Sequence, residues 1–462
     1  MSPHPDVCGR QRTLRFLVAS LCGLTAVGCG TGPDAHPAFP MTGSARSVFE
    51  FSPQCLAPGG PTTSDSAPMS PTPTDNLTPI PQTPAAESMR AQPVRPAPAD
   101  LSNLRFASPL VIPEGGTYSG NWESLDPGVP AVTITTEDPV VIRGSHLRSR
   151  GHLIDGAIDG IDLTVIDSVG VGLNPSQMGG VPGRFVNLRN PRRILIEHNE
   201  LNGTSGIRLE GYMGKRDHDT YRIRANRVTN VDGRMSTGNG FSNEDSDAAL
   251  VQFVQFVEVQ AVPGIEVSWN DVRNEPGRSR VEDVVSVYES SGTANNPISL
   301  QHNFIDGAYP ADPASDQYTG GGIMLGDGPS AAHVSATQNI VLNTTNYGIA
   351  VNAGRDMLIS GNHILATGLL PDGRALPAQN VGIYVWNSQQ ASNFGNVRVL
   401  DNVVRWERPS QGSRNDHWLP DVSTVTTSGF YDGIPTGEVI NAAYASWLCQ
   451  TLEVDIRIGP KI

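Results

Sequence analysis

Seven asparagines recur in one local pattern, apolar-x-x-Asn-x-apolar, along the second half of the chain, and this repeat constrains the fold more than any other feature. They are Asn199, Asn226, Asn270, Asn303, Asn339, Asn362 and Asn402. Their spacings are 27, 44, 33, 36, 23 and 40 residues, as if a fixed unit carried insertions of different length. A β-solenoid, whose coils share one core but differ in their loops, produces such spacings. Asparagine suits the turn between strands because it tolerates left-handed backbone, and stacked asparagines can bond one another's amides.

A second motif, Gly-Ile-x-apolar, follows several of these asparagines. It covers residues 206–209, 322–325, 348–351 and 382–385, and residues 284–287 occupy the same place without glycine. Successive side chains of a strand point to opposite faces, so the aliphatic residues should fill the solenoid and the alternate residues should form one exposed sheet face. The residues predicted on that face are Arg208, Glu210, Ser286, Tyr288, Met324, Gly326, Ala350, Asn352, Tyr384 and Trp386.

The distance from each asparagine to the next strand of this kind varies most. It is 7 residues after Asn199 and 9 after Asn339, but 14 after Asn270, 19 after Asn303 and 20 after Asn362. The insertions therefore gather at one turn of the coil, where they should wall one edge of the exposed face. Variable loops on a rigid scaffold commonly form binding sites, so the sequence predicts a site on this face.

The first hundred residues lack both motifs. Basic residues precede a short apolar run, residues 16–28, which is typical of an export signal and too short to span a bilayer permanently. Small residues stand before Cys29 as in the lipobox of bacterial lipoproteins, so we expect removal of residues 1–28 and lipidation of Cys29. An ordinary secretory signal cleaved nearby is the alternative. Residues 51–100 hold 12 of the 37 prolines, which predicts a disordered linker over residues 29–100.

Residues 101–462 are expected to form one solenoid domain with both ends covered. Short apolar strands in residues 109–155 predict an N-terminal cap coil. Apolar residues at helical spacing over residues 437–448 predict an amphipathic helix that covers the open C-terminal end. Cys55 and Cys449 remain after export, and the sequence leaves open whether they pair.

The charge of the chain restricts its partners. A net charge of −14 argues against nucleic acid and against an anionic membrane surface. It also disfavours polyanionic substrates unless positive charge is concentrated locally. We expect a monomer at the cell surface or in the periplasm, held to the membrane by its lipid anchor alone.

These motifs resemble those of the right-handed parallel β-helix proteins, the pectate-lyase-like superfamily, and more narrowly a group of bacterial exported β-helix repeat proteins. The segments that carry the resemblance are residues 115–124 (GGTYSGNWES), 264–283 (GIEVSWNDVRNEPGRSRVED), 288–293 (YESSGT), 320–327 (GGGIMLGD) and 381–387 (VGIYVWN). The likeness covers roughly residues 105–410 and implies an all-β fold, the right-handed parallel β-helix. It implies no particular activity.

A more distant likeness is to lyases that act on dermatan sulfate and alginate. In those proteins a lysine on one coil and an Arg-His pair on the next carry out β-elimination. The lysine would fall near Glu289 here, and the Arg-His pair near Gly326 and Asp327. Because both positions depart from the pattern, the resemblance does not carry a lyase mechanism to this chain.

A basic cluster offers another route to elimination. Lys215, Arg216 and His218 follow one of the predicted strands. A cation can neutralise a uronate carboxylate while a base removes the C5 proton. The alternative is a solvated cluster of charges in a loop.

Four carboxylates fall at the ends of two adjacent coils: Glu282, Asp283, Glu289 and Asp327. Coils stack about 4.8 Å apart, so carboxylates of neighbouring coils can lie within the ~5–9.5 Å that glycoside hydrolysis uses. These residues predict a hydrolase site, and their oxygens could also bind Ca²⁺. The alternative is that they cap backbone amides at turns.

Arginines and aromatic residues are the candidates for substrate binding. Arg208 and Arg280 could hold carboxylate or sulfate groups, or could pair with acids nearby. Tyr288, Tyr384 and Trp386 should point outward, where sugars can stack on their rings. A strand register shifted by one residue would bury them instead.

The sequence therefore predicts an exported, lipid-anchored parallel β-helix that binds a polysaccharide on its loop-walled face. Two hypotheses for its activity stay open. The protein is either a polysaccharide lyase or glycoside hydrolase, or a non-catalytic surface protein that binds glycans or has a structural role.

Overall fold

The computed structural model describes residues 95–461, apart from residues 217, 422–430, 432 and 434. The predicted signal peptide, the lipidation at Cys29, most of the predicted linker and Cys55 lie outside the described residues. All described residues belong to one compact unit.

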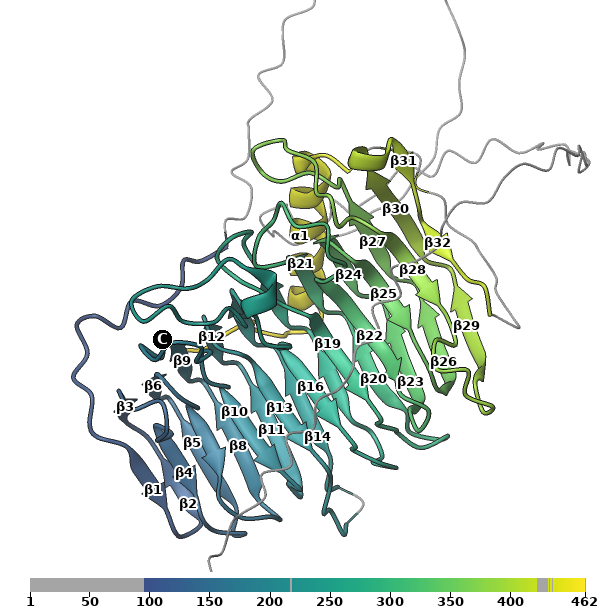
Figure 1. The fold of residues 1–462 in the computed structure, drawn as a ribbon. Helices are drawn as coiled ribbons and strands as arrows, with labels where there is room; N and C mark the ends of the chain where they lie inside the picture. Colours follow the sequence, from purple (N-terminus) through teal and green to yellow (C-terminus); the bar gives the residue numbers. More distant parts are fainter. Residues whose placement is uncertain (1–94, 217, 422–430, 432, 434, 462) are drawn as a thin grey trace, which may run out of the picture. The chain divides into compact units, whose positions relative to one another are not determined.

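Each coil of the described chain contributes one strand to each of three sheets (Figure 1). Up to the last coil, the strand order in every sheet follows the sequence in steps of three. The paired strands are parallel, with the exception of β30 and β31 at the end of the third sheet. This topology is that of a parallel β-solenoid and confirms the predicted all-β class.

Sheet 1 has 11 strands, and its inner face contributes to the core. They are β1 (Leu110–Ile112), β4 (Val132–Ile134), β7 (Ile154–Gly156), β10 (Val186–Arg189), β13 (Ile207–Glu210), β16 (Val254–Val257), β19 (Asp283–Tyr288), β22 (Gly321–Asp327), β25 (Tyr347–Val351), β28 (Val381–Val385) and β32 (His417–Trp418).

Sheet 2 has 10 strands, each following a strand of sheet 1 along the chain. They are β2 (Gly116–Tyr118), β5 (Val140–Arg143), β8 (Asp162–Ile166), β11 (Arg193–Glu197), β14 (Tyr221–Arg224), β17 (Glu266–Ser268), β20 (Ile298–Gln301), β23 (Ala332–Thr337), β26 (Arg355–Ser360) and β29 (Gly395–Leu400).

Sheet 3 has 11 strands and completes each coil. They are β3 (Asn121–Ser124), β6 (His146–Ser149), β9 (Val169–Gly172), β12 (Glu200–Asn202), β15 (Arg227–Thr229), β18 (Asp271–Arg273), β21 (Phe304–Ala308), β24 (Ile340–Thr344), β27 (His363–Ala366), β30 (Val403–Arg408) and β31 (Ser413–Arg414). The helical elements of the described chain are α1 (Gly437–Glu453) and the short 3₁₀ helices η2 (Asp245–Asp247) and η3 (Pro409–Gln411).

The interior is a stack of aliphatic side chains. In sheet 1, Val254, Val285, Ile323, Ile349 and Ile383 follow one another in register on successive strands and are at most 1% exposed. Burial of each such side chain is worth roughly 1.5–3 kcal/mol, and branched residues also favour strands. The predicted inward half of the Gly-Ile-x-apolar motif is confirmed.

The asparagine ladder joins sheet 2 to sheet 3. From Asn199 to Asn362, each side-chain Nδ2 donates to the Oδ1 of the next asparagine in the ladder at 2.9–3.0 Å. Each also donates to a backbone carbonyl of the coil before, as Asn303 does to Val267 at 2.9 Å. The seven side chains are at most 3% exposed. The predicted ladder is confirmed, and its bonds satisfy amides that would otherwise be buried without partners.

The asparagines themselves are not the left-handed residues of these turns. The residue before each one takes that conformation, as in His198 (φ 56°), Trp269 (φ 57°) and Asp401 (φ 54°). Asparagine is required here for its side-chain bonds rather than for its backbone. The ladder also extends one coil further than predicted, because the backbone N–H of Ser168 donates to Asn199 Oδ1 at 3.0 Å.

The long insertions lie where the sequence placed them, between strands of sheet 3 and strands of sheet 1. Long connections join β15 to β16, β18 to β19, β21 to β22 and β27 to β28, whereas only residues 345 and 346 separate β24 from β25. The insertions therefore border one edge of sheet 1.

The tail forms the predicted helix, but α1 lies along the outer face of sheet 3 (Figure 1). Tyr444 and Trp447 of α1 pack on Phe304 and Leu365, and Trp447 Nε1 donates to the carbonyl of His302 at 2.7 Å. The predicted position over the open end is thus corrected. Apolar side chains that point outward from sheet 3 explain the difference, because the helix removes them from water.

The packed chain also begins earlier than residue 101. Arg95 Nε lies 3.0 Å from Asp271 Oδ2 on β18, and the Asp271 side chain is only 1% exposed. On α1, Cys449 is buried and, within the described residues, free of a disulfide. In the described part of the chain, no helix combines the length and the apolar character that spanning a bilayer requires.

Candidate functional site

The outer face of sheet 1 carries one row of side chains in register, here called the central column. It consists of Arg208, Gln255, Ser286, Met324, Ala350, Tyr384 and Trp418. The three residues in the middle are at most 5% exposed. Long polar side chains stand at one end of the column and aromatic rings at the other. The side chains of the column therefore project least over β19, β22 and β25.

A β-bulge in β22 changes which residue points outward beside the middle of the central column. The register between β19 and β22 shifts after Ser286, so Tyr288 lies beside Asp327. Gly326 points inward instead, because a Cβ there would lie 2.7 Å from Cε of the buried Met357. The prediction that Gly326 belongs to the outer face is wrong. The extra residue of the bulge reverses the alternation and brings Asp327 outward.

Asp283 begins β19, at the edge of sheet 1 that the insertions border. Its carboxylate accepts a hydrogen bond from the Tyr347 hydroxyl. Asp283 is 7% exposed and Tyr347 is 3% exposed. Burial raises the pKa of Asp283 well above its usual range, and the charge of Glu282 raises it further. Asp283 therefore keeps a proton at pH values where an exposed aspartate has lost its own.

Glu282 lies next to Asp283 and is partly exposed. Its Oε2 accepts a hydrogen bond from Gln252 Nε2 at 2.6 Å. Burial raises the pKa of Glu282, the positive charge of Arg280 opposes that rise, and the negative charge of Asp327 adds to it. Adjacent acids of this kind bind protons as a pair rather than independently.

Asp327 ends β22 at the opposite edge of sheet 1. Its Oδ1 accepts a hydrogen bond from Asn352 Nδ2 at 3.0 Å. Burial raises the pKa of Asp327, the bond from Asn352 opposes that rise, and the charge of Glu289 adds to it. Acids that hold protons more tightly than usual therefore stand on both sides of the central column. Such groups are typical of sites for general acid–base chemistry.

Glu289 is a turn residue and differs from the other three carboxylates. It adopts a left-handed conformation (φ 45°), and its Oε2 accepts hydrogen bonds from the backbone N–H of Ser330, at 2.9 Å, and from the Ser330 hydroxyl. Glu289 thus ties one coil to the next. The contacts of Glu289 are those of a carboxylate that caps a backbone amide at a turn, which was the alternative to a catalytic role.

Three aromatic side chains stand at the far end of the face, here called the aromatic platform: Tyr384, Trp386 and Trp418. The ring centroid of Trp418 lies 5.4 Å from that of Trp386 and 6.2 Å from that of Tyr384. Trp386 is 42% exposed and Trp418 is 45% exposed. The predicted outward positions of Tyr384 and Trp386 match the structure. Exposed rings grouped in this way are typical of binding surfaces rather than of cores.

Tyr288 is also on the outer face, half-buried beside Asp327. Burial raises the pKa of Tyr288, and the charge of Glu289 raises it further. Within the described residues, no ring contact joins Tyr288 to the aromatic platform. The structure therefore separates Tyr288 from the other two predicted aromatic residues.

The two predicted arginines have partners in the protein. Arg208 Nη1 lies 2.7 Å from Glu210 Oε2 on the same strand. Arg280 is 6% exposed and donates from Nη1 to the carbonyl of Ala249 at 2.7 Å. Burial lowers the pKa of Arg280, and the charge of Glu282 opposes that effect. Arg280 thus contributes positive charge beside the acids, and Arg208 is neutralised by its neighbour.

The basic cluster lies elsewhere, in the exposed connection between β13 and β14. The backbone N–H groups of Lys215 and Arg216 donate to Asp219 Oδ2 at 3.0 and 3.1 Å, and His218 Nε2 lies 3.9 Å from Asp219 Oδ1. In the described chain no ion pair links these three residues with the carboxylates of sheet 1. The structure does not bring the elimination candidates and the hydrolase candidates together.

Metal binding was one prediction for the acidic residues. Among the residues that the structure describes, no group of three or more His, Cys, Asp and Glu side chains is placed to hold a metal ion. The carboxylates instead have separate partners: Tyr347 for Asp283, Gln252 for Glu282 and Asn352 for Asp327.

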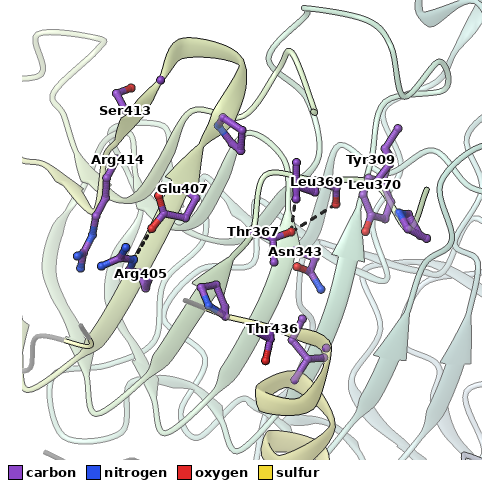
Figure 2. Close-up of a pocket in the computed structure, with 16 residues that line it drawn as sticks. Tyr309, Asn343, Thr367, Leu369, Leu370, Arg405, Glu407, Ser413, Arg414 and Thr436 are labelled. Carbon is purple, nitrogen blue, oxygen red and sulfur yellow. Dashed lines mark hydrogen bonds and ion pairs between the residues drawn. The ribbon is translucent and has the colours of Figure 1, made fainter. Parts of the chain in front are cut away.

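A cavity of about 920 Å³ lies apart from these residues, on the outside of sheet 3 between α1 and the connection from β27 to β28 (Figure 2). Its walls include Leu369, Leu370 and Ile440. Its charged residues are neutralised, since Arg405 pairs with Glu407 and Arg414 pairs with Asp416. The outer face of sheet 1 is the better candidate site because its acids have perturbed pKa values and lie near exposed rings.

No protein-family model, curated protein or solved structure matches this chain. The chemistry of the site therefore has to be argued from its own residues.

Two residues of the site were absent from the sequence prediction. Tyr347 stands immediately before one Gly-Ile-x-apolar motif, and this neighbourhood was the only signal for it. Trp418 lies in the coil after Asn402, beyond the last repeat of both motifs. Its place in register with Tyr384 depends on β32, a strand of two residues.

Proposed function

We propose that the protein binds a polysaccharide along the central column of sheet 1 and hydrolyses it. The observation that carries this proposal is the placement of acids with raised pKa values on both sides of that column, with the partly exposed Glu282 and the buried Asp283 at one edge and the partly exposed Asp327 at the other. A glycan that follows the column would pass between them and reach the aromatic platform. In the inverting form of glycoside hydrolysis, one carboxylic acid protonates the glycosidic oxygen and a second carboxylate activates a water molecule on the opposite face of the sugar.

The protonation of these acids supports hydrolysis. A general acid for this reaction has to hold a proton near neutral pH, which burial achieves for carboxyl groups. The pKa values of Glu282, Asp283 and Asp327 are all raised, with burial as the largest cause. In the proposed reaction, the pair at one edge gives a proton to the glycosidic oxygen as the C1–O bond breaks. Asp327 accepts a proton from the water that attacks C1.

Elimination is less well supported. It needs a cation against the uronate carboxylate and a base beside the C5 proton. Lys215, Arg216 and His218 are exposed in the connection between β13 and β14, and in the described residues no ion pair links them to the acids of sheet 1. Near the acids, Arg280 is buried and donates to the backbone.

A non-catalytic glycan-binding protein is the second candidate. One specific observation favours it: each raised acid already has a hydrogen-bond partner within the protein, as Asp283 has in Tyr347. Carboxyl groups held in this way can stabilise the fold without taking part in catalysis. The aromatic platform supports glycan binding equally well under both candidates.

The remaining features of the proposal come from the sequence. We propose that the solenoid is right-handed and pectate-lyase-like, since nearly all crossovers between parallel strands have that hand. We also propose an export signal, a Pro-rich linker and an anchor at Cys29, which would keep the solenoid near a membrane without inserting it.

The test uses the purified full chain and a panel of neutral and uronate polysaccharides. New reducing ends without ultraviolet absorbance of unsaturated uronate are expected from hydrolysis. Asp327→Asn should lower turnover by at least about a hundredfold, as removal of a general acid or base does, while Lys215→Ala should leave it unchanged. Absorbance together with reducing ends would contradict hydrolysis in favour of elimination. Binding without turnover would favour the non-catalytic candidate.

A further inference from the structure

Tyr347 reaches Asp283 across an intervening coil. Asp283 begins β19, Gly321 lies beside it on β22, and Tyr347 begins β25 on the coil after that. A Cβ on Gly321 would lie 2.3 Å from Tyr347 Cζ and 2.5 Å from Asp283 Oδ1. The absence of a side chain at Gly321 therefore opens the space in which the phenol and the carboxylate meet.

The same tyrosine contacts the aromatic platform. The ring of Tyr347 meets that of Tyr384 edge to face, with centroids 5.1 Å apart and planes at 88°. Tyr384 is in turn a neighbour of Trp418. Met324, Ala350 and Val381 pack around these two tyrosines. One small apolar cluster outside the main core thus holds the acid at one end and the exposed rings at the other.

The residue in register with Tyr347 on β28 is Val381, so a coil of sheet 1 can close without a tyrosine in this place. The hydroxyl of Tyr347 is buried, and a buried hydroxyl is costly unless it is bonded. The carboxylate of Asp283 provides that bond and is itself fixed by it.

We propose that Tyr347 is a positioning residue, which holds Asp283 and through it the Glu282–Asp283 pair at the edge of the glycan path. This inference rests on the proposed function, because it assigns Tyr347 a role in the same reaction. Glu282, the more exposed member, gives its proton to the glycosidic oxygen as the C1–O bond breaks. Asp327 removes a proton from a water molecule while the oxygen of that water bonds to C1. The two carboxyl groups thereby exchange protonation states, and no other reactant is needed.

The test compares Tyr347→Phe with the unaltered full chain. Phenylalanine keeps the ring and its contact with Tyr384 but removes the donor. The hydrogen bond from Tyr347 lowers the pKa of Asp283 against the effect of burial, so its loss raises that pKa further. Titration of the carbon-13-labelled Asp283 carboxyl by NMR should show a higher midpoint in the variant, because a hydrogen bond to the charged form of a carboxyl group lowers its pKa. The alkaline limb of turnover should move in the same direction, with KM unchanged.

Tyr212→Phe is the matched control. The hydroxyl of Tyr212 donates to the carbonyl of Asp219, outside the site, so its removal should leave the Asp283 midpoint where it is. Gly321→Ala is a second variant. Its new methyl group would push Tyr347 and Asp283 apart, so it should move the Asp283 midpoint in the same direction as Tyr347→Phe. It disturbs the same contact without altering either of the bonding groups, so an unchanged Asp283 midpoint in a folded Gly321→Ala protein would also contradict the proposal.

The outcomes separate this inference from the proposed function. An unchanged Asp283 midpoint in an active Tyr347→Phe enzyme would overturn the positioning role alone. A shifted midpoint in a protein that turns over no glycan of the panel would overturn the hydrolysis, and the catalytic role of Tyr347 with it. A shifted midpoint together with a shifted alkaline limb supports both.

Discussion

The Tyr347 hydroxyl donates a hydrogen bond to the Asp283 carboxylate over the backbone of Gly321. The φ of Gly321 is not in the left-handed region, so its backbone conformation does not require glycine. The requirement comes from the two neighbouring side chains, which occupy the volume that a Cβ would need. The identity of one residue is thus determined by a contact between residues of the coils on either side.

Gly321→Ala should therefore destabilise the protein. The new methyl group would overlap Tyr347 and Asp283, and forced overpacking of this kind costs about 1–3 kcal/mol. Thermal and urea unfolding would measure the loss. Gly128→Ala is the control, because the nearest atom to its Cβ would be 3.4 Å away, an ordinary contact. Equal stability of both variants would mean that the contact over Gly321 is not tight in solution.

Asp283→Asn should make the protein more stable near neutral pH. The pKa of Asp283 is raised in the folded state, so the folded protein binds this proton more tightly than the unfolded chain. Its stabilising contribution is present below the unfolded pKa, about 4, and is lost as the pH rises through the folded pKa. Asparagine does not titrate and still offers an oxygen to Tyr347. The gain in unfolding free energy should therefore grow from pH 4 towards pH 8.

Asp356→Asn provides a comparison of opposite sign. The pKa of Asp356 is lowered, first by the hydrogen bond from Asn396. Its contribution to stability is present above the unfolded pKa and is lost as the pH falls through the folded pKa. Replacement should therefore destabilise the protein at pH 7 and matter less at pH 3. The same sign for both variants would contradict the assigned shifts.

Much of the fold could be predicted from the sequence because each coil from Asn199 to Asn402 carries the same short pattern around its asparagine. Consecutive asparagines of the ladder bond each other, so the spacing of the pattern gives the length of each of these coils. The bulge at Gly326 gave no such signal, since one extra residue in a strand leaves composition unchanged. The position of α1 depended on which outward residues of sheet 3 are apolar, among them Phe304 and Leu365.

The candidate site was predictable in part for the same reason. Strand ends can be counted from the motifs, and the motifs single out Asp283 and Asp327 from the sequence alone. Burial and hydrogen bonds decide which of these carboxylates differ chemically, and such contacts join distant parts of the chain. Glu289 looked equivalent in sequence but bonds Ser330 as a turn residue. The bond from Tyr347 to Asp283 joins residues of two different coils across Gly321, so the sequence alone does not indicate it.

Asn303→Asp should destabilise the solenoid in a pH-dependent manner. The ladder needs an amide at this position, because Nδ2 donates to both Asn339 Oδ1 and the carbonyl of Val267. A carboxylate would place acceptor against acceptor, with a loss of roughly 2–4 kcal/mol. Burial should raise the pKa of the new acid, so stability would fall as the pH rises above about 4 and return when the acid is protonated.

Urea unfolding of Asn303→Asp at pH 4 and at pH 7 would measure this dependence. Asn295→Asp adds the same charge at an exposed position and serves as the control. If both variants lost the same stability at pH 7, net charge rather than the ladder would be the cause.

Trp386→Ala and Trp418→Ala should each weaken glycan binding by about tenfold, as expected for the loss of one stacked ring. Both rings are exposed and adjacent, so they can be removed without opening the core. Isothermal titration with cellohexaose and with polygalacturonate, used as neutral and anionic probes, would measure the affinities. Leu452→Ala is the control, because Leu452 is 72% exposed on α1, outside sheet 1. If a glycan bound the wild-type protein and both tryptophan variants equally, the aromatic platform would not be part of its binding surface, and the path along the central column would end at the acids.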